Sequence, residues 1–387
     1  MRRAMQTVGW GLYLASSWTW CIGMFLPILL LRWWGWPGFL AFAVPNVVGC
    51  ALFGYVLTPD TSRALVRRFR AWIAIFGAAT IAYQVGFLLK AGVVAGLVAA
   101  LPVTIALLAT SRGTTERSDR TLMAVGAAAW LASLLLFARF GGGTLADLPS
   151  GGTLPPMSLA WAAPFMAFGF LLCPYLDPTF HLALQRSPSR HAFGVFGAAF
   201  AVMLLFTAAF ADAGLGPEPR PGALLWGRPA FEWQWGLQAA FTMVAVAAAM
   251  RSLEPVSNLG GTRLLLPGMV LTACLALGWQ YFAEPALPAM ATSLNPPSGP
   301  VQGEATYLRW LGLYGVLFPG MLLLGLKRVP PVPLVVAIVG AGFLAEMGMI
   351  GGRMPLLGAA VGVLLAASMW TSRQAAETAE IPPTDTR

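Results

Sequence analysis

One apolar stretch of the chain holds two prolines and two ionisable residues close together. Pro174 and Pro178 flank Asp177, and His181 follows Asp177 by four residues. Proline lacks the amide that a helix interior needs and crowds the preceding turn, so we expect the helix to break or kink within 173–179. An ionisable group at membrane depth is costly and marks a candidate functional site. Breaking a helix there frees backbone groups that can bind a solute or an ion.

Asp177 has two readings at this break. As a structural residue, it caps a half-helix that has Pro178 at its first position. As a functional residue, it contributes to coupling, to gating or directly to a solute site. Its neighbours Tyr175, Thr179 and His181 are then candidates for the same site, and His181 lies one helical turn from Asp177.

The first apolar stretch carries three hydroxyls, on Ser16, Ser17 and Thr19, before Gly23 and Pro27. Small hydroxyls in membrane helices commonly bond the carbonyl four residues back or pack against another helix. The alternative is that this helix is also locally unwound, with its hydroxyls and carbonyls lining a cavity.

Further polar side chains lie inside other apolar stretches. Each can form a hydrogen bond between helices or contact a solute. They are Asn46, Gln84, Gln238, Thr242 and Gln280.

The composition indicates an integral membrane protein. Of 387 residues, 58% are apolar and only 10% are charged, whereas soluble domains carry about 25% charged residues. The net charge of +9 does not indicate nucleic-acid binding, because the basic residues form no aromatic-interleaved patch. The four cysteines have no metal-like spacing, and we interpret them as packing residues. They are Cys21, Cys50, Cys173 and Cys274.

A spanning helix needs about 20 mostly apolar residues, and the sequence predicts an all-α protein with about twelve such spans. They lie at 8–31, 37–57, 71–89, 91–110, 121–138, 157–176, 192–212, 233–250, 264–283, 305–326, 331–349 and 355–370.

The basic residues predict the orientation. With a cytoplasmic N-terminus, seventeen of the 24 Lys and Arg residues fall on the cytoplasmic side, as the positive-inside rule requires. We therefore expect residues 1–370 to form a single transmembrane domain in the cell (inner) membrane, with both termini in the cytoplasm. The polar tail, 371–387, is predicted to be disordered.

The sixth and seventh spans resemble a stretch of the sodium/solute symporter family. The run Asp177-Pro-Thr-Phe-His-Leu-Ala-Leu-Gln-Arg-Ser-Pro-Ser-Arg190-His-Ala-Phe-Gly194 is similar to that family's broken helix, Gln-Arg pair and basic cytoplasmic turn. Gln185 and Arg186 take the places of the Gln-Arg pair. The run from Ser16 to Tyr55 is loosely similar to the family's first core helix pair.

This resemblance implies the LeuT-type fold, in which two inverted repeats of five helices each begin with a broken helix. The repeats would cover 8–138 and 157–326, and two extra helices would cover 331–370. The family's second sodium site uses hydroxyls of its eighth core helix, where this chain offers Thr242. The resemblance implies no resident cofactor and leaves coupling to Na⁺ or H⁺ open.

Two functions follow from these patterns. The first is a secondary transporter that moves a small solute by alternating access. The alternative is a non-transporting membrane subunit or scaffold that retains a transporter-derived fold and has a membrane-protein partner. We do not expect an enzyme, because the sequence has neither a His-Glu-x-x-His nor a Gly-x-Ser-x-Gly motif.

Overall fold

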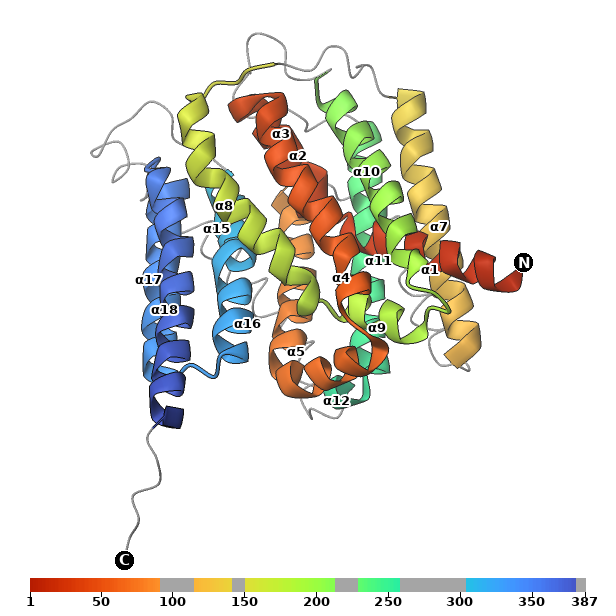
Figure 1. Cartoon of the computed structure of the whole chain (residues 1–387). Helices are drawn as coiled ribbons and strands as arrows, with labels where there is room; N and C mark the ends of the chain where they lie inside the picture. Colours follow the sequence, from red (N-terminus) through yellow and green to blue (C-terminus); the bar gives the residue numbers. More distant parts are fainter. Residues whose placement is uncertain (91–114, 141–149, 213–228, 258–303, 381–387) are drawn as a thin grey trace, which may run out of the picture.

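A computed structural model describes residues 1–90, 115–140, 150–212, 229–257 and 304–380 (Figure 1). Within these ranges the regular structure is entirely helical. Seven of the described helices are long and apolar enough to cross a membrane, and an eighth span is formed if a strongly bent pair is counted as one. Apolar side chains also cover the outward faces of these helices, as at Val332, Val336 and Phe343. The prediction of an all-α, multi-pass membrane protein is therefore confirmed.

The first half of the chain forms helices of unequal length. They are α1 (Arg2–Trp18), α2 (Cys21–Trp34), α3 (Trp36–Val44), the π-helical η1 (Pro45–Gly49), α4 (Cys50–Val56), α5 (Pro59–Lys90) and α7 (Thr115–Phe140).

The second half of the chain also consists of helices of unequal length. Its helices are α8 (Pro156–Leu172), the 3₁₀ turn η3 (Cys173–Tyr175), α9 (Pro178–Arg186), α10 (His191–Asp212), α11 (Pro229–Ser252), α12 (Glu254–Ser257), α15 (Glu304–Gly312), the π-helical η4 (Leu313–Leu317), α16 (Phe318–Leu326), α17 (Pro331–Met349) and α18 (Pro355–Glu380).

The first predicted span is not one straight helix over 8–31. It is the pair α1 and α2, which bend by 62° at residues 19 and 20. Thr19 ends α1 and Trp20 adopts an extended backbone before α2 begins. In Figure 1, α1 lies across the direction of α2 and of α7. The local unwinding of the first helix is therefore observed, whereas a cavity lined by its hydroxyls stays a prediction.

Other helices differ from the predicted spans mainly at their ends. The third span was expected to begin at residue 71, but α5 begins at Pro59 and bends at Phe69, where the backbone leaves helical geometry. The sequence did not predict this extension, because residues 59–70 are rich in polar side chains and do not form part of a long apolar stretch. In the same way α18 continues to Glu380, into the predicted tail, through a segment rich in the helix formers Ala and Glu. Pro164 lies inside α8 without ending it.

Some predictions fall outside the described residues. They are the spans at 91–110 and 264–283, with Gln280 and Cys274, and the end of the tail at 381–387.

The two broken helices run in opposite directions. The end of α2 meets the start of α8, where the amides of Thr153 and Leu154 donate to the carbonyls of Arg32 and Trp33, at 3.0 and 2.8 Å. From there α8 descends past α2 toward α9 (Figure 1). The end of α2 and the start of α8 thus lie at one face of the bundle.

The remaining helices pack around this pair. Helix α1 contacts α7, α10 and α11, whereas α8 contacts η1, η4 and α18 and α9 contacts α5 and α11. Glycine allows the closest approach: a Cβ on Gly315 of η4 would overlap the ring of Phe165 on α8. The π-helical turn η4 therefore lies directly against α8.

Candidate functional site

The break between α1 and α2 leaves backbone groups that neighbouring helices satisfy. The amide of Cys21, at the start of α2, donates to Gln84 Oε1 on α5 at 3.3 Å. On the other side of the break, the Thr242 hydroxyl of α11 donates to the carbonyls of Ser17 and Ser16, at 3.2 and 3.5 Å. Helix ends need such partners, above all inside a membrane. Side chains of α5 and α11 therefore stabilise this break.

The break between α8 and α9 is held from within its own segment. The turn at η3 closes with bonds from the amides of Leu176 and Asp177 to the carbonyls of Cys173 and Pro174, at 2.9 and 3.2 Å. Asp177 then caps α9, with Pro178 at the first helical position. The structural reading of Asp177 as a helix cap is confirmed.

The cap is a buried carboxylate that one residue satisfies twice. Asp177 is 2% exposed. One of its oxygens, Oδ1, accepts from both the amide and the hydroxyl of Thr179, each at 2.6 Å. Bonds to an ionised acceptor are stronger than neutral ones, so this cap is a strong local constraint on the break.

The two breaks touch each other. The hydroxyl of Ser17 lies 3.4 Å from that of Thr179 and 3.1 Å from the carbonyl oxygen of Leu14, and it shares its one hydrogen between these two acceptors. One residue further along each segment, the rings of Trp18 and Phe180 pack edge to face with centroids 4.9 Å apart. A chain of polar contacts therefore runs from Thr242 through the Ser17 carbonyl and hydroxyl to Thr179 and Asp177.

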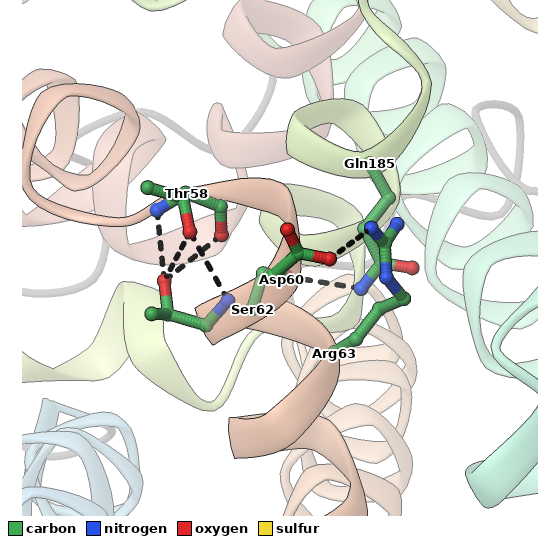
Figure 2. Close-up of polar contacts among 6 residues, drawn as sticks. Thr58, Asp60, Ser62, Arg63 and Gln185 are labelled. Atoms are coloured by element: carbon green, nitrogen blue, oxygen red, sulfur yellow. Dashed lines mark hydrogen bonds and ion pairs between the residues drawn. The ribbon is translucent and has the colours of Figure 1, made fainter.

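His181 ties α9 back to the break and to α5. Its Nε2 lies 2.9 Å from the carbonyl oxygen of Tyr175, which can only accept, so Nε2 carries the hydrogen. Nδ1 then accepts from the Ser62 hydroxyl at 2.8 Å, and Ser62 in turn accepts from Gln185 Nε2 at 3.0 Å. Figure 2 shows Gln185 reaching the first turn of α5, where Thr58 caps that helix. This arrangement holds a neutral imidazole between two segments.

The predicted site residues are all buried except Tyr175, which is half-buried. Hydrogen bonds join Ser17, Thr179, Asp177 and Thr242 into the central chain of contacts. Their role in solute binding stays a prediction.

The other predicted residues reach the breaks indirectly or point elsewhere. Asn46 Oδ1 accepts from Trp18 Nε1 at 2.7 Å. Ser16 donates to the carbonyl of Gly126 at 2.7 Å, and Thr19 donates to the carbonyl four residues back, at 2.7 Å. The hydroxyls of Ser16 and Thr19 thus follow the structural reading, although the helix is broken beside them.

The sequence alone did not mark two residues of the site, Ser62 and Tyr307, as candidates. Ser62 lies in the polar start of α5, outside the predicted third span. Tyr307 donates its hydroxyl to the carbonyl of Cys21 at 3.2 Å and resembled any aromatic residue near a span end. A contact across the bundle of this kind depends on how the helices are arranged.

Two partly buried ion pairs lie away from the breaks. Arg186, at the end of α9, bonds Asp119 near the start of α7. On α15, Nε and Nη2 of Arg309 contact Glu346 Oε1 of α17, at 2.9 and 2.8 Å. Each ion pair joins two helices near their ends. It would have to break if those two helices moved apart.

The chemistry that these residues offer is binding and positioning. In the part of the chain that the structure describes, no three His, Cys, Asp or Glu residues gather as a metal site. The fold and the burial define the chain as an all-helical, multi-pass membrane protein. In the comparisons with known proteins, no family model matches the chain, and no curated protein matches it significantly.

Proposed function

We propose that the chain is a secondary transporter that moves a small solute across the cell membrane by alternating access. The observation that carries this proposal is the meeting of two antiparallel broken helices, α1–α2 and α8–α9, at their breaks. Broken helices near the middle of a membrane present backbone dipoles and carbonyls to solutes and ions, and they supply hinges.

The packing supports an inverted repeat of five helices. If the spans are numbered as predicted, five contacts between spans of one half and their neighbours have a counterpart five spans later. The α1–α7 contact corresponds to α8–η4, α1–α10 to α8–η1, and α1–α11 to α9–α5. In the same way α2–α5 corresponds to α9–α11, and α11–α7 to α5–α16. An inverted repeat of the LeuT type predicts this exchange, and unrelated helices have no reason to follow it.

The charge pattern supports the orientation that we propose, with both termini in the cytoplasm. Coupling to Na⁺ or H⁺ also belongs to the proposal. The Ser16 and Ser17 carbonyls and the Thr242 hydroxyl could contribute ligands to a sodium ion, since hard cations prefer oxygen. His181 and Asp177 are the residues through which a proton could couple.

The second candidate function is a subunit or scaffold that does not transport. The observation in its favour is the closed packing around the breaks, where Asp177, Thr179 and His181 are already satisfied by protein groups. It predicts a membrane-protein partner that remains bound on solubilisation.

Native cysteines at both breaks allow the two functions to be separated. Cys21 begins α2 and Cys173 lies in η3, and both are buried. In variants that keep one of them and replace the other cysteines by alanine, a membrane-impermeant maleimide would be applied to right-side-out and inside-out vesicles. A transporter exposes the retained thiol to water from each side in turn, so labelling should proceed in both preparations.

Labelling rates that also change between sodium and potassium, or between pH 6 and pH 8, would support ion coupling. A thiol that reacts only after denaturation, in both vesicle types and all conditions, would contradict alternating access and favour the subunit. A cysteine placed at the exposed Arg63 serves as the control for access to one side.

A further inference from the structure

Three glutamines of α5 and α11 are buried with polar atoms left unpaired. Among the described residues, Nε2 of Gln84, Oε1 of Gln238 and both polar atoms of Gln234 have no hydrogen-bond partner. All three side chains are fully buried. A buried polar atom without a partner costs about 1–3 kcal/mol, so such atoms call for a bound molecule that completes them.

Gln84 and Gln238 lie at the same level of the bundle. Helices α5 and α11 run antiparallel, because Gly77 faces Met250 at one end of their contact and Phe87 packs on Trp235 toward the other. Gln84 precedes Phe87 by one turn, and Gln238 follows Trp235 by one turn. Because the two helices are antiparallel, both glutamines lie one turn from the Phe87–Trp235 contact on the same side of it.

That level is the break itself. Gln84 already holds the Cys21 amide there, and Thr242, one turn beyond Gln238, holds the Ser17 carbonyl. Gln238 Nε2 donates to the carbonyl of Ala129, at 3.1 Å, and to the hydroxyl of Ser133, at 2.6 Å. The side-chain oxygen of Gln238, Oε1, remains an unused acceptor. The break is therefore flanked by one unused amide donor and one unused amide acceptor.

Aromatic rings cover the α2 side of this level. Phe25 of α2 packs on Trp235 and on Tyr307, with centroids 6.2 and 4.9 Å apart, and Phe87 packs on Trp235 at 5.2 Å. Such rings bind flat or apolar faces of a solute. The rings touch one another here, so a solute enters only when they part, and the bend between α1 and α2 supplies a hinge for that movement.

Charge narrows the class of solute. Among the fully buried side chains that the structure describes, Asp177 is the one acidic group, and there is no Lys or Arg. Its carboxylate is engaged by Thr179 on the α9 side of the second break. A carboxylate or phosphate solute at the glutamines would meet no basic side chain, and the first amide of α2, that of Cys21, already donates to Gln84, so its charge would be poorly compensated.

We propose that the solute is small and uncharged, with a polar edge that bonds the Gln84 and Gln238 amides and a flat apolar face that packs on the rings. Sugars and nucleobases have this chemistry. This inference rests on the proposed transport function and names the class of its solute.

The test is equilibrium binding to the purified full chain, followed by thermal stability and tryptophan fluorescence. A compound that binds the folded state selectively raises its apparent stability. The probes are glucose, galactose, uracil and adenine as uncharged compounds, with glutamate, inorganic phosphate and choline as charged ones. At least one uncharged probe should stabilise the protein, and no charged probe should do so.

Variants then locate the binding site. Gln84→Leu and Gln238→Leu should each raise the apparent Kd of the stabilising probe about tenfold or more, since each removes a bond to the solute. Gln6→Leu, a matched change on α1 away from the breaks, should leave the Kd unchanged. Gln84→Asn, which keeps the amide but shortens it, serves as a milder variant should a leucine variant fail to fold.

Stabilisation by glutamate, phosphate or choline alone would overturn the inference, and so would the absence of binding by every uncharged probe. These outcomes are distinct from a failure of the transport proposal. Cysteine labelling that alternates between the two sides, combined with no uncharged binder, would leave transport standing and refute only the class of solute.

Discussion

Replacing Asp177 by alanine tests how strongly its cap holds the second break. The change removes the oxygen that accepts from both the amide and the hydroxyl of Thr179 at 2.6 Å. Losing a helix N-cap costs about 0.5–2 kcal/mol, and leaving a buried hydroxyl unsatisfied costs about 1–3 kcal/mol. Because the two contributions overlap on one residue, we expect Asp177→Ala to lower the free energy of unfolding by about 2–4 kcal/mol.

Asparagine separates the cap from the charge. Asp177→Asn keeps an acceptor oxygen and the shape of the side chain, so its loss should be only about 1 kcal/mol, the difference between a charged and a neutral acceptor. If Asp177 also takes part in gating or coupling, Asp177→Asn should depress transport while the protein stays folded.

The assay is unfolding in mixed micelles of detergent and dodecyl sulfate, followed by tryptophan fluorescence. Asp60→Ala is the matched control, because Asp60 is exposed and pairs with Arg63 on the same turn of α5, and such a pair contributes at most about 1 kcal/mol. If Asp177→Ala is no more destabilising than Asp60→Ala, the cap does not hold the break and the reasoning is wrong.

Three further substitutions test other contacts. Ser62→Ala should cost about 1–3 kcal/mol, because it leaves the buried His181 and the half-buried Gln185 of α9 without their shared partner, while Thr7→Ala near the exposed start of α1 should cost less; equal losses in the same unfolding assay would refute the His181 arrangement. Gly315→Ala should cost about 1–3 kcal/mol by forcing a methyl group against α8, and an unchanged stability would show that this contact is loose. Asp119→Ala should destabilise the protein more than the exposed Asp60→Ala does, and the opposite order would show that the ion pair to α9 contributes nothing.

The membrane class and the second break could be predicted because each depends on local sequence. Long apolar stretches alone predict spanning helices. Pro174 and Pro178 remove helical amides wherever the segment lies, and Asp177 before Pro178 is a local cap signal. The structure confirms the break, which takes the form of a 3₁₀ turn, and the cap.

The first break was harder to predict because no proline lies at residues 19 and 20. The residues that stabilise this break are far from it in the sequence. Gln84 on α5 and Thr242 on α11 form the hydrogen bonds that the free backbone groups need. Both residues were recognised as buried polar candidates, but the sequence does not say which backbone atoms they meet. Ser62 was missed for a related reason, since its helix begins before the apolar stretch that predicted it.

The most direct test of alternating access is a pair of distance measurements by spin labels in reconstituted protein. One pair, at Gly151 just before α8 and at Trp233 near the start of α11, reports the separation of these two segments at the face where α2 ends. The other pair, at Arg190 and Arg251, reports the separation of the start of α10 from α11 at the opposite face. All four positions are exposed, and they would be labelled as cysteines in a cysteine-free background.

Alternating access predicts two populations of distances at each face, with one face widening as the other narrows when sodium, pH or a bound solute is changed. A single, unchanged distance at both faces under every condition would contradict the transporter and leave a static membrane subunit.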